Sequence, residues 1–469
     1  MGNSLFAKRS QRINLPQRGQ KPPRSHLRAN AMSVLIPILL FLIACSDFIS
    51  PVKSTPEPTE YSFNYWLLNN VYLYEEELPN LREDGDSVQE LYTVLKDPYT
   101  NYTIPSQSEN RATQTSTSLV IGGDVGMRYY NFSDREYPIF ISRVYPKGPA
   151  GKASIPRYGN ILKVNGIELK GEHARNTYDS TLTFNKNIEL TIAYKGDTKL
   201  YKLQKDSVFA PTVFVDTLFE DKDKGYPGIV FVTIETFKIK TEDKKNGTYG
   251  EVKDYLISSA SDKRVRVLDL RNNPGGVVEQ CINVADLFVK SGTLSSRRRR
   301  ALNADGASVL RRASNEAKAG DPGETGNFLI LANRASASCA EIFIAAVTEL
   351  TDIPLVGSRT FGKGIGQTQY WTYAGGLTTI TDIEFRTPKG NSYHGIGVIP
   401  KYECTETLYE ECAAKVANKL YGVKIPTQDE TLAKRAPEFT EKTFSEFEGG
   451  SIEWADPDIY FKTFEKTYP

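Results

Sequence analysis

The sequence predicts a multi-domain α/β protein. Its 469 residues, 39% of them hydrophobic, are enough for two to four domains with cores of their own. Apolar runs of strand length at 265–270 and 328–332 each lead into a helical stretch, which is typical of α/β units. Residues 117–206 differ, because short strand patterns alternate there with glycine-containing turns. We therefore expect a β-rich domain followed by an α/β domain.

Residues 1–45 predict a targeting segment. An apolar run too short to span a bilayer comfortably ends in the tetrad Leu-Ile-Ala-Cys45, which matches a bacterial lipobox. The match implies cleavage before Cys45 and a lipid on its sulfur, which would anchor the protein in the bacterial cell envelope, facing the periplasm or the cell surface. An uncleaved membrane anchor is the alternative, and either Met1 or Met32 can be the true start. Residues 46–60, rich in Pro, Ser and Thr, are expected to form a tether.

Composition narrows the choice of partners. A net charge of +1 with 25% charged residues argues against nucleic acid as the main partner. The basic cluster consists of four arginines at 297–300, with Arg311 and Arg312 nearby. Its neighbours are Ser, Gly, Asn and Asp, so we expect a solvated loop, with contact to a substrate or a membrane as the alternative. No group of His, Cys and carboxylates has metal-ligand spacing, so neither a metal nor another cofactor is expected.

Two short segments in the C-terminal half predict a nucleophile and its base. Residues 336–341 (SASCAE) follow a strand pattern and open an apolar helix, so the hydroxyl of Ser338 is presented at a strand-to-helix turn. Residues 361–364 (FGKG) supply a lysine between glycines. Serine needs an adjacent base, and a desolvated lysine can serve as one. Taken singly, the two segments are more often a helix N-cap and a surface turn.

A Ser-His-Asp triad fits the sequence less well. Of the three histidines, only His394 lies in the same half as Ser338, and no Asp stands near it in sequence to orient its ring. A Ser-Lys dyad is therefore favoured. Distance along the sequence does not decide whether His394 contacts Ser338 in the folded protein, so this alternative stays open.

A third segment suits an oxyanion hole. Residues 271–276 (RNNPGG) follow the strand pattern at 265–270 and precede a helical stretch. Paired glycines let a backbone N–H approach an oxyanion with no side chain in the way. A tight turn without a catalytic role is the alternative.

These segments resemble those of the tail-specific, or C-terminal-processing, serine peptidases, whose patterns read SASASE, FGKG with a glutamine shortly after, and DLRNNPGG. The resemblance implies that Ser338 is the nucleophile and Lys363 the base. It also implies that Gln367 orients the lysine by a hydrogen bond.

The same resemblance implies an oxyanion hole built from the N–H of Cys339 and that of Gly275 or Gly276. Cys339 and Ala340 stand where the family pattern has Ala and Ser. Both residues are small, so neither is expected to block the turn.

The resemblance also implies a division of the chain. Residues 61–116, with aromatic residues at helical spacing and a closing DPYT at 97–100, resemble the small helical N-terminal region of the family. Residues 117–206 resemble a PDZ domain, and 207–402 then form an α/β catalytic core of the ClpP/crotonase-like type. No catalytic or binding role is assigned to residues 403–469, which are expected to form a covering helical tail.

The PDZ resemblance rests on the segments GPA at 148–150 and VNG at 164–166. In PDZ domains, N–H groups of a glycine-rich loop bind a peptide's C-terminal carboxylate while the peptide adds to a sheet as a strand. By position, this loop is Val125, Gly126 and Met127. It departs from the usual Gly-Leu-Gly-Phe.

Four cysteines follow Cys45. Cys404 and Cys412 are close enough in sequence to pair in an oxidising compartment. Cys281 is expected to be buried on a helix. Cys339 is expected to be a small filler, because a disulfide beside the nucleophile would distort the site.

Together, the motifs predict a serine endopeptidase that selects unfolded or extended protein substrates by their free C-termini. A non-catalytic PDZ scaffold with a decayed peptidase body is the alternative. A Ser-Lys amidase or β-lactam-type enzyme would need Ser-x-x-Lys, whereas Glu341 stands three residues after Ser338. A homo-oligomer is compatible with the sequence.

Overall fold

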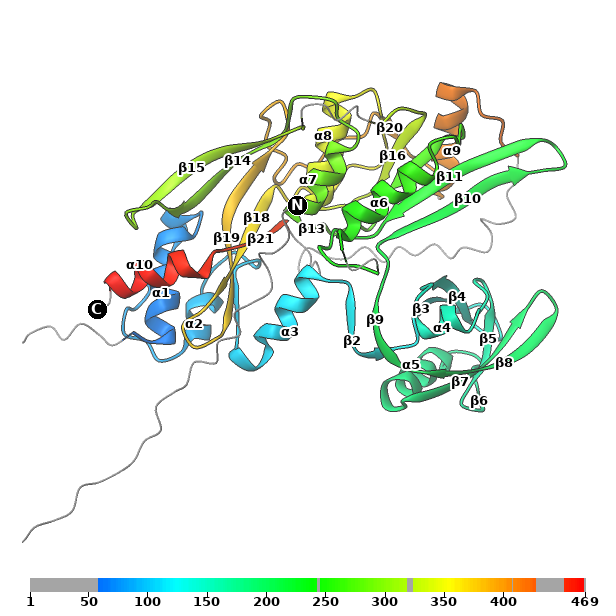
Figure 1. Cartoon of the computed structure of the whole chain (residues 1–469), viewed down its shortest axis with the longest axis horizontal. Coiled ribbons are helices and arrows are strands. Elements are labelled where there is room, and N and C mark those ends of the chain that lie inside the picture. Colours follow the sequence, from blue (N-terminus) through cyan, green and yellow to red (C-terminus); the bar gives the residue numbers. More distant parts are fainter. Residues whose placement is uncertain (1–57, 243–244, 319–323, 407, 427–450, 468–469) are drawn as a thin grey trace, which may run out of the picture. The chain divides into compact units, whose positions relative to one another are not determined.

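The computed structural model describes residues 58–467 except 243–244, 319–323, 407 and 427–450 (Figure 1). Helices and several sheets alternate along these residues, which confirms the predicted α/β class. The predicted targeting segment, with Cys45, lies outside the described residues. Within them, no helix is long and apolar enough to cross a membrane.

The first described elements are mainly helical. They are α1 (Glu60–Val71), the 3-10 turn η1 (Glu75–Glu77), α2 (Val88–Thr93), β1 (Asn101–Thr103) and α3 (Pro105–Ser116). The Thr59 hydroxyl accepts the Ser62 N–H at 3.0 Å and starts α1. The aromatic residues of α1 are buried in one cluster with those of α2, as their helical spacing leads one to expect.

A β-rich module follows. Its elements are β2 (Leu119–Asp124), β3 (Met127–Asn131), β4 (Ile139–Val144), α4 (Pro149–Lys152), β5 (Asn160–Val164), β6 (Ile167–Glu168), α5 (Ala174–Phe184), β7 (Asn187–Tyr194), β8 (Asp197–Gln204) and β9 (Asp206–Phe209). Five strands pair in the order β3-β4-β5-β7-β8, β6 pairs with β5, and β2 pairs with β9. The sheet and α5 enclose a separate hydrophobic core.

The remaining elements build two further sheets. They are β10 (Val213–Asp221), β11 (Tyr226–Ile234), α6 (Gly247–Ser258), β12 (Arg266–Asp269), β13 (Gly276–Val277), α7 (Val278–Asp286), β14 (Thr293–Leu302), β15 (Ser308–Glu316), β16 (Phe328–Ala332), α8 (Cys339–Leu350), β17 (Leu355–Gly357), β18 (Ile365–Trp371), β19 (Leu377–Arg386), β20 (Tyr402–Glu403), α9 (Tyr409–Tyr421), β21 (Ser451–Trp454) and α10 (Pro457–Thr467). One sheet has the order β10-β11-β12-β16-β17-β20, and the other has the order β13-β21-β18-β19-β14-β15 with β1 on β19. The division of the chain drawn from the sequence stays a prediction.

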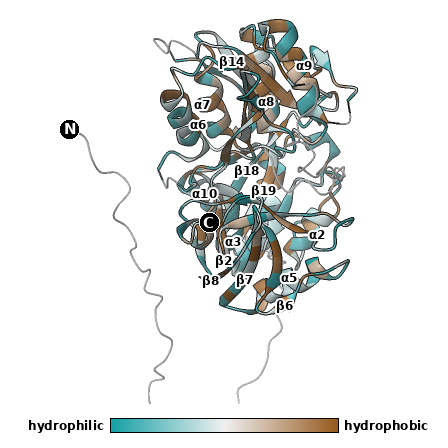
Figure 2. Cartoon of the chain, turned by 90° about the vertical axis from the view of Figure 1, so that its right-hand side faces the viewer, coloured by the Kyte–Doolittle hydropathy of each residue, from teal (hydrophilic) through white to brown (hydrophobic). Residues whose placement is uncertain are grey.

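The first of these sheets is covered on both faces, as its continuous apolar strands require. Helices α6, α7 and α8 share one core with it, and α9 packs against the opposite face. Hydrophobic residues run along α8 in Figure 2. A disulfide between Cys404 and Cys412 ties the start of α9 to the segment before it, so these two cysteines do pair.

The arginine run at 297–300 is not the solvated loop that the sequence predicts. It lies in β14, between β15 and β19. Carboxylates reach it from other strands: Arg298 pairs with Glu384, and Arg299 pairs with Asp382 at 2.9 Å. Sequence neighbours could not reveal these partners, because they are distant along the chain.

Candidate active site

The predicted nucleophile occupies a strained turn. Ser338 has φ 59° and ψ −118°, and α8 begins at the next residue. A positive φ costs a non-glycine residue roughly 1–3 kcal/mol and persists where the surroundings impose it. The surroundings here are the two neighbouring motifs, since the Asn273 carbonyl accepts the Ala337 N–H at 2.9 Å and the Ser336 carbonyl accepts the Phe361 N–H at 3.0 Å. The structure thus brings all three sequence motifs together.

Glu341 joins the serine turn to the lysine loop. Its Oε2 accepts the N–H of Ser338 at 2.8 Å and that of Lys363 at 2.7 Å. Its Oε1 accepts the Gly362 N–H at 2.7 Å and the Thr360 hydroxyl at 2.5 Å. Burial raises the pKa of Glu341 to about 7, and these hydrogen bonds oppose the rise. Because all four groups donate, the ionised carboxylate fits this position.

Lys363 is 1% exposed. Its Nζ lies 3.7 Å from the centre of the Tyr99 ring. Burial lowers the pKa of Lys363 to about 7, against the opposing effect of the negative charges on Asp97 and Glu341. A lysine in this setting is a usable base near neutral pH.

Gln367 and His394 are the two other candidate residues of this half of the chain. Gln367 is buried on β18 and donates from Nε2 to the Thr381 hydroxyl at 3.0 Å. Its role in orienting Lys363 stays a prediction. His394 is exposed as a whole residue, and partial desolvation of its ring lowers the ring's pKa from 6.5. The hydrogen-bond partner of Ser338 Oγ is Ser451.

The glycine pair lies against the nucleophile turn. Gly275 has φ 98°, and a Cβ there would meet the Cys339 nitrogen at 2.8 Å, so only glycine allows this approach. Its own N–H donates to Asn273 Oδ1 at 2.9 Å. Gly276 begins β13 and pairs with Ser451. Because the Gly275 N–H is already bonded to Asn273, Gly276 is the candidate oxyanion donor that we keep of the two.

The expectation that Cys339 is an unpaired filler is wrong. Cys339 forms a disulfide with Cys281, which is buried on α7. Cys339 is the first residue of α8, and both cysteines belong to the hydrophobic core that α7 and α8 share, so the disulfide is accommodated next to the nucleophile turn. The disulfide fixes α7, which follows the glycine pair, to α8, which follows Ser338.

The C-terminal extension contributes a residue that the sequence did not predict. Ser338 Oγ and Ser451 Oγ share a hydrogen bond of 2.8 Å, and both residues are fully buried. Ser451 begins β21, which lies between β13 and β18. The nucleophile is therefore covered by the chain's own strand.

The predicted carboxylate loop precedes β3. Gly126 has φ 78°, and a Cβ there would meet the Gly148 Cα at 2.9 Å. The Val125 N–H donates to Asp124 Oδ1 at 2.6 Å, and Met127 is the first residue of β3. A bound peptide carboxylate would compete with Asp124 for this N–H.

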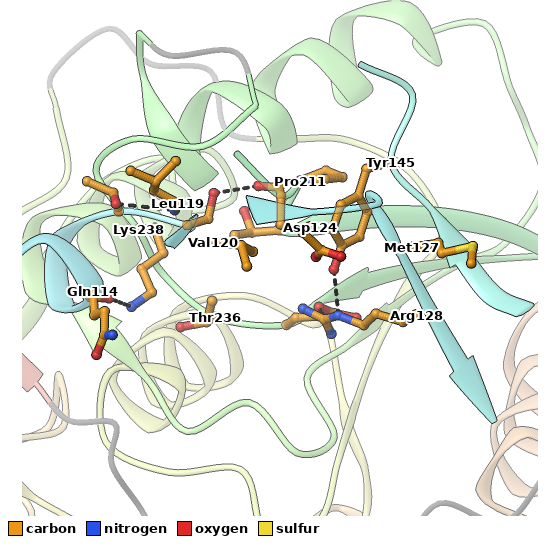
Figure 3. Close-up of a pocket in the computed structure, with 15 residues that line it drawn as sticks. Gln114, Leu119, Val120, Asp124, Met127, Arg128, Tyr145, Pro211, Thr236 and Lys238 are labelled. Carbon is orange, nitrogen blue, oxygen red and sulfur yellow. Dashed lines mark hydrogen bonds and ion pairs between the residues drawn. The ribbon is translucent and has the colours of Figure 1, made fainter. Parts of the chain in front are cut away.

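A pocket of about 370 Å³ adjoins this loop (Figure 3). Arg128 crosses it, pairing with Glu235 at 2.5 Å and donating to the Tyr145 hydroxyl at 2.7 Å. Lys238 lines the opposite end, donates to the Gln114 carbonyl at 2.6 Å, and has its pKa lowered to about 8 by burial. The adjacent Thr236 donates to the Gly275 carbonyl at 2.8 Å. The pocket therefore lies between the β-rich module and the glycine loop.

Sequence reasoning missed three residues of this site. Glu341 had a signal, since Ser-x-x-Glu before an apolar helix is a capping-box pattern. Tyr99 lies in the DPYT segment, to which the sequence assigned no role in the site. Ser451 had none, because nothing in its local sequence marks a strand that joins a distant sheet.

Comparisons with known proteins agree with this geometry. The model of peptidase family S41 matches residues 228–404, which contain all three motifs. A protein described as a probable CtpA-like serine protease of Staphylococcus aureus (strain COL) is 28% identical over 431 residues, covering 88% of this chain and 81% of its own. A similarly described protein of Staphylococcus saprophyticus is 28% identical over 349 residues, covering 74% of this chain and 64% of its own.

A solved structure shows the same fold. A crystal structure described as that of a "putative S41 protease" from Bacteroides fragilis has a TM-score of 0.53 and 14% identity, and the match covers 77% of this chain and 97% of that chain. The family model and the relatives agree with each other. Residues 228–404 match peptidase family S41, and the chain is a serine peptidase.

Proposed function

We propose that the chain is an endopeptidase in which Ser338 is the nucleophile and Lys363 is its general base. The observation that carries this proposal is the single carboxylate oxygen of Glu341 that holds the backbone N–H groups of both residues. This bridge fixes the serine turn and the lysine loop side by side. The lysine is also buried, so its amine is neutral in a useful fraction of molecules near pH 7.

The reaction follows from this arrangement. Lys363 Nζ takes the proton of Ser338 as Oγ attacks the scissile carbonyl carbon, and the carbonyl oxygen gains the negative charge. The N–H groups of Cys339 and Gly276 stabilise that oxyanion, an effect worth roughly 3–4 kcal/mol per donor. The ammonium of Lys363 then protonates the leaving amine. In the second half of the reaction, water loses a proton to the same lysine and attacks the acyl carbon, and the lysine returns the proton to Ser338 Oγ as the acyl group leaves. Gln367 would hold the lysine in position.

Cleavage of an unfolded protein substrate tests the nucleophile. Ser338→Ala should remove turnover to the limit of detection. Ser336→Ala is the matched control, because Ser336 belongs to the same turn but bonds to the Leu270 carbonyl. The control should keep turnover, and loss in the control alone would contradict the assignment of Ser338.

The β-rich module is proposed to act as a PDZ domain that binds the free C-terminus of a substrate. Among the described residues, β3 is the terminal strand of its sheet, so its edge is open to an added peptide strand. The candidate carboxylate loop runs into β3, and Tyr129 of β3 contacts Tyr178 of α5. The pocket in Figure 3 supports a path from this edge toward the glycine loop.

Substrate termini test the PDZ role. Two unfolded substrates should differ only in the last group, an apolar residue with a free carboxylate or the same residue as its amide. We expect kcat/KM to be about tenfold higher for the free carboxylate, because the amide loses a charge-assisted hydrogen bond. Equal values for the two substrates would show that the module does not read C-termini.

We also propose that the protein is lipidated at Cys45 and faces an oxidising compartment of the bacterial envelope. Two disulfides, Cys281–Cys339 and Cys404–Cys412, support such a compartment. Metabolic labelling with a fatty-acid analogue should mark the wild type and the control Ser46→Ala but not Cys45→Ser. Label that persists in Cys45→Ser would overturn the lipid-anchor proposal.

A further inference from the structure

The strand β21 occupies the gap between two strands of the active site. β13 begins with Gly276, the candidate oxyanion donor, and β18 begins two residues after Lys363. Ser451 of β21 pairs in parallel register with Gly276 on one side and with Gly366 on the other. An extended substrate reaching both the glycine loop and the lysine must cross this gap, which is one strand wide.

The contact at the nucleophile is not that of a substrate in position to react. The group of Ser451 that bonds to Ser338 Oγ is its side-chain hydroxyl. A hydroxyl offers no carbonyl carbon to attack. The strand therefore holds the position of a substrate without presenting a bond to cleave.

Charged side chains of another strand hold Glu453 of β21. Residues two apart lie on one face of a strand, so Glu453 is on the same face as Ser451. Its carboxylate pairs with Arg297 and, at 3.2 Å, with Arg299, and the side chains of all three residues are at most 24% exposed. Arg297 and Arg299 stand on β14 and reach β21 across two intervening strands. A carboxylate as buried as that of Glu453 needs an oppositely charged partner.

Aromatic contacts of α10 anchor the segment that contains β21. In α10, the Phe464 ring lies 5.0 Å from that of Phe63, edge to face, and the Tyr460 ring lies 4.8 Å from that of Tyr370. Phe464 is fully buried and Tyr460 is 8% exposed. An anchored segment has a high effective concentration at its site, so a weak strand interaction can still fill the groove.

We propose that the groove between β13 and β18 binds an extended peptide with an acidic side chain two residues after the one that faces Ser338, that Arg297 and Arg299 bind this acid, and that residues 451–454 fill the groove as an intramolecular competitor. This inference rests on the proposed function of Ser338. It adds that the enzyme prefers substrates with an acidic side chain at this position, and it explains why β21 covers Ser338.

The first test removes the negative charge of Glu453 in β21. In the full chain, Glu453→Gln should raise kcat/KM for an unfolded protein substrate about tenfold, the scale expected for a lost, partly buried charge pair. Glu465→Gln is the matched control, because Glu465 is exposed on α10 of the same segment. A purely structural role of β21 predicts the opposite sign, since loosening the sheet would lower activity.

Peptides added in trans are the second test and do not depend on how Glu453→Gln folds. The probe is the peptide GGSIEWAD, residues 449–456, and its partner carries Gln in place of Glu. In the wild type and in Glu453→Gln, the Glu peptide should inhibit competitively with a Ki about tenfold below that of the Gln peptide. In Arg297→Gln and Arg299→Gln, the two Ki values should converge.

The outcomes separate this inference from the proposed function. Absence of Ser338-dependent cleavage in every variant would contradict the proposed function. The groove would then be tested by binding of a labelled GGSIEWAD peptide to the Glu453→Gln chain. If cleavage depends on Ser338, but Glu453→Gln behaves as Glu465→Gln does and the two peptides inhibit equally, the groove inference is wrong and the nucleophile assignment stands.

Discussion

Lys363→Ala should lower kcat/KM by about 10³-fold or more, because it removes the base that takes the proton of Ser338. Lys363→Arg should fail to restore turnover, since a guanidinium stays protonated at any working pH. The far-ultraviolet circular dichroism of both variants should match the wild type, and activity should be measured on the same unfolded substrate. Substantial turnover in either variant would redirect attention to His394.

The pH profile separates the two bases further. Burial lowers the pKa of Lys363 to about 7, so the amine accepts a proton above that pH and is blocked below it. We therefore expect kcat/KM to rise with pH through about 7. An ordinary lysine would place this rise above pH 10. His394, whose pKa is lowered from 6.5, would place it on the acid side of 6.5.

Glu341→Gln should have the second large effect. A glutamine fills the same space but has one amide NH₂ in place of an oxygen. One Glu341 oxygen accepts from Ser338 and Lys363, and the other accepts from Gly362 and Thr360. In either orientation of the glutamine amide, its NH₂ group therefore faces two hydrogen-bond donors and can accept from neither. We expect kcat to fall about 10²-fold and the free energy of unfolding to fall by about 2–4 kcal/mol, from two unsatisfied buried groups.

The pH profile of Glu341→Gln distinguishes positioning of the dyad from general destabilisation. The carboxylate charge opposes the lowering of the Lys363 pKa, so its removal should move the rise of kcat/KM to lower pH. Glu349→Gln, also on α8, is the control, because Glu349 bonds to the Lys389 N–H at the other end of the helix. An unmoved profile in Glu341→Gln would mean that Glu341 acts through stability alone.

The parts of the site that the sequence could predict are those encoded locally. Ser338 follows a strand and precedes a helix, and the glycines at 275 and 276 follow another strand, so local patterns place both at strand ends. The lysine loop was found by its motif. Its burial against Tyr99, which shifts its pKa, depends on a segment more than two hundred residues earlier and could not be predicted from local sequence.

The failures share one cause, which is contact between distant segments. The Cys281–Cys339 disulfide joins residues 58 apart, and only the packing of α7 on α8 brings them together. The arginines of β14 gain carboxylates from β19 and β21, which turns an expected solvated loop into a paired strand. For residues 403–469 the sequence predicts a covering helical tail without chemistry, and the contact of Ser451 with the nucleophile is what it did not predict. Local periodicity carries no information on such pairings.

Trapping the acyl-enzyme tests the assignment of the nucleophile most directly. Acid quench of the Glu453→Gln enzyme during turnover of a peptide ester, followed by digestion and mass spectrometry, reports which residue carries the acyl group. We expect the adduct on Ser338, and its absence in Ser338→Ala. An adduct on another residue, or wild-type cleavage by Ser338→Ala, would contradict the proposed mechanism.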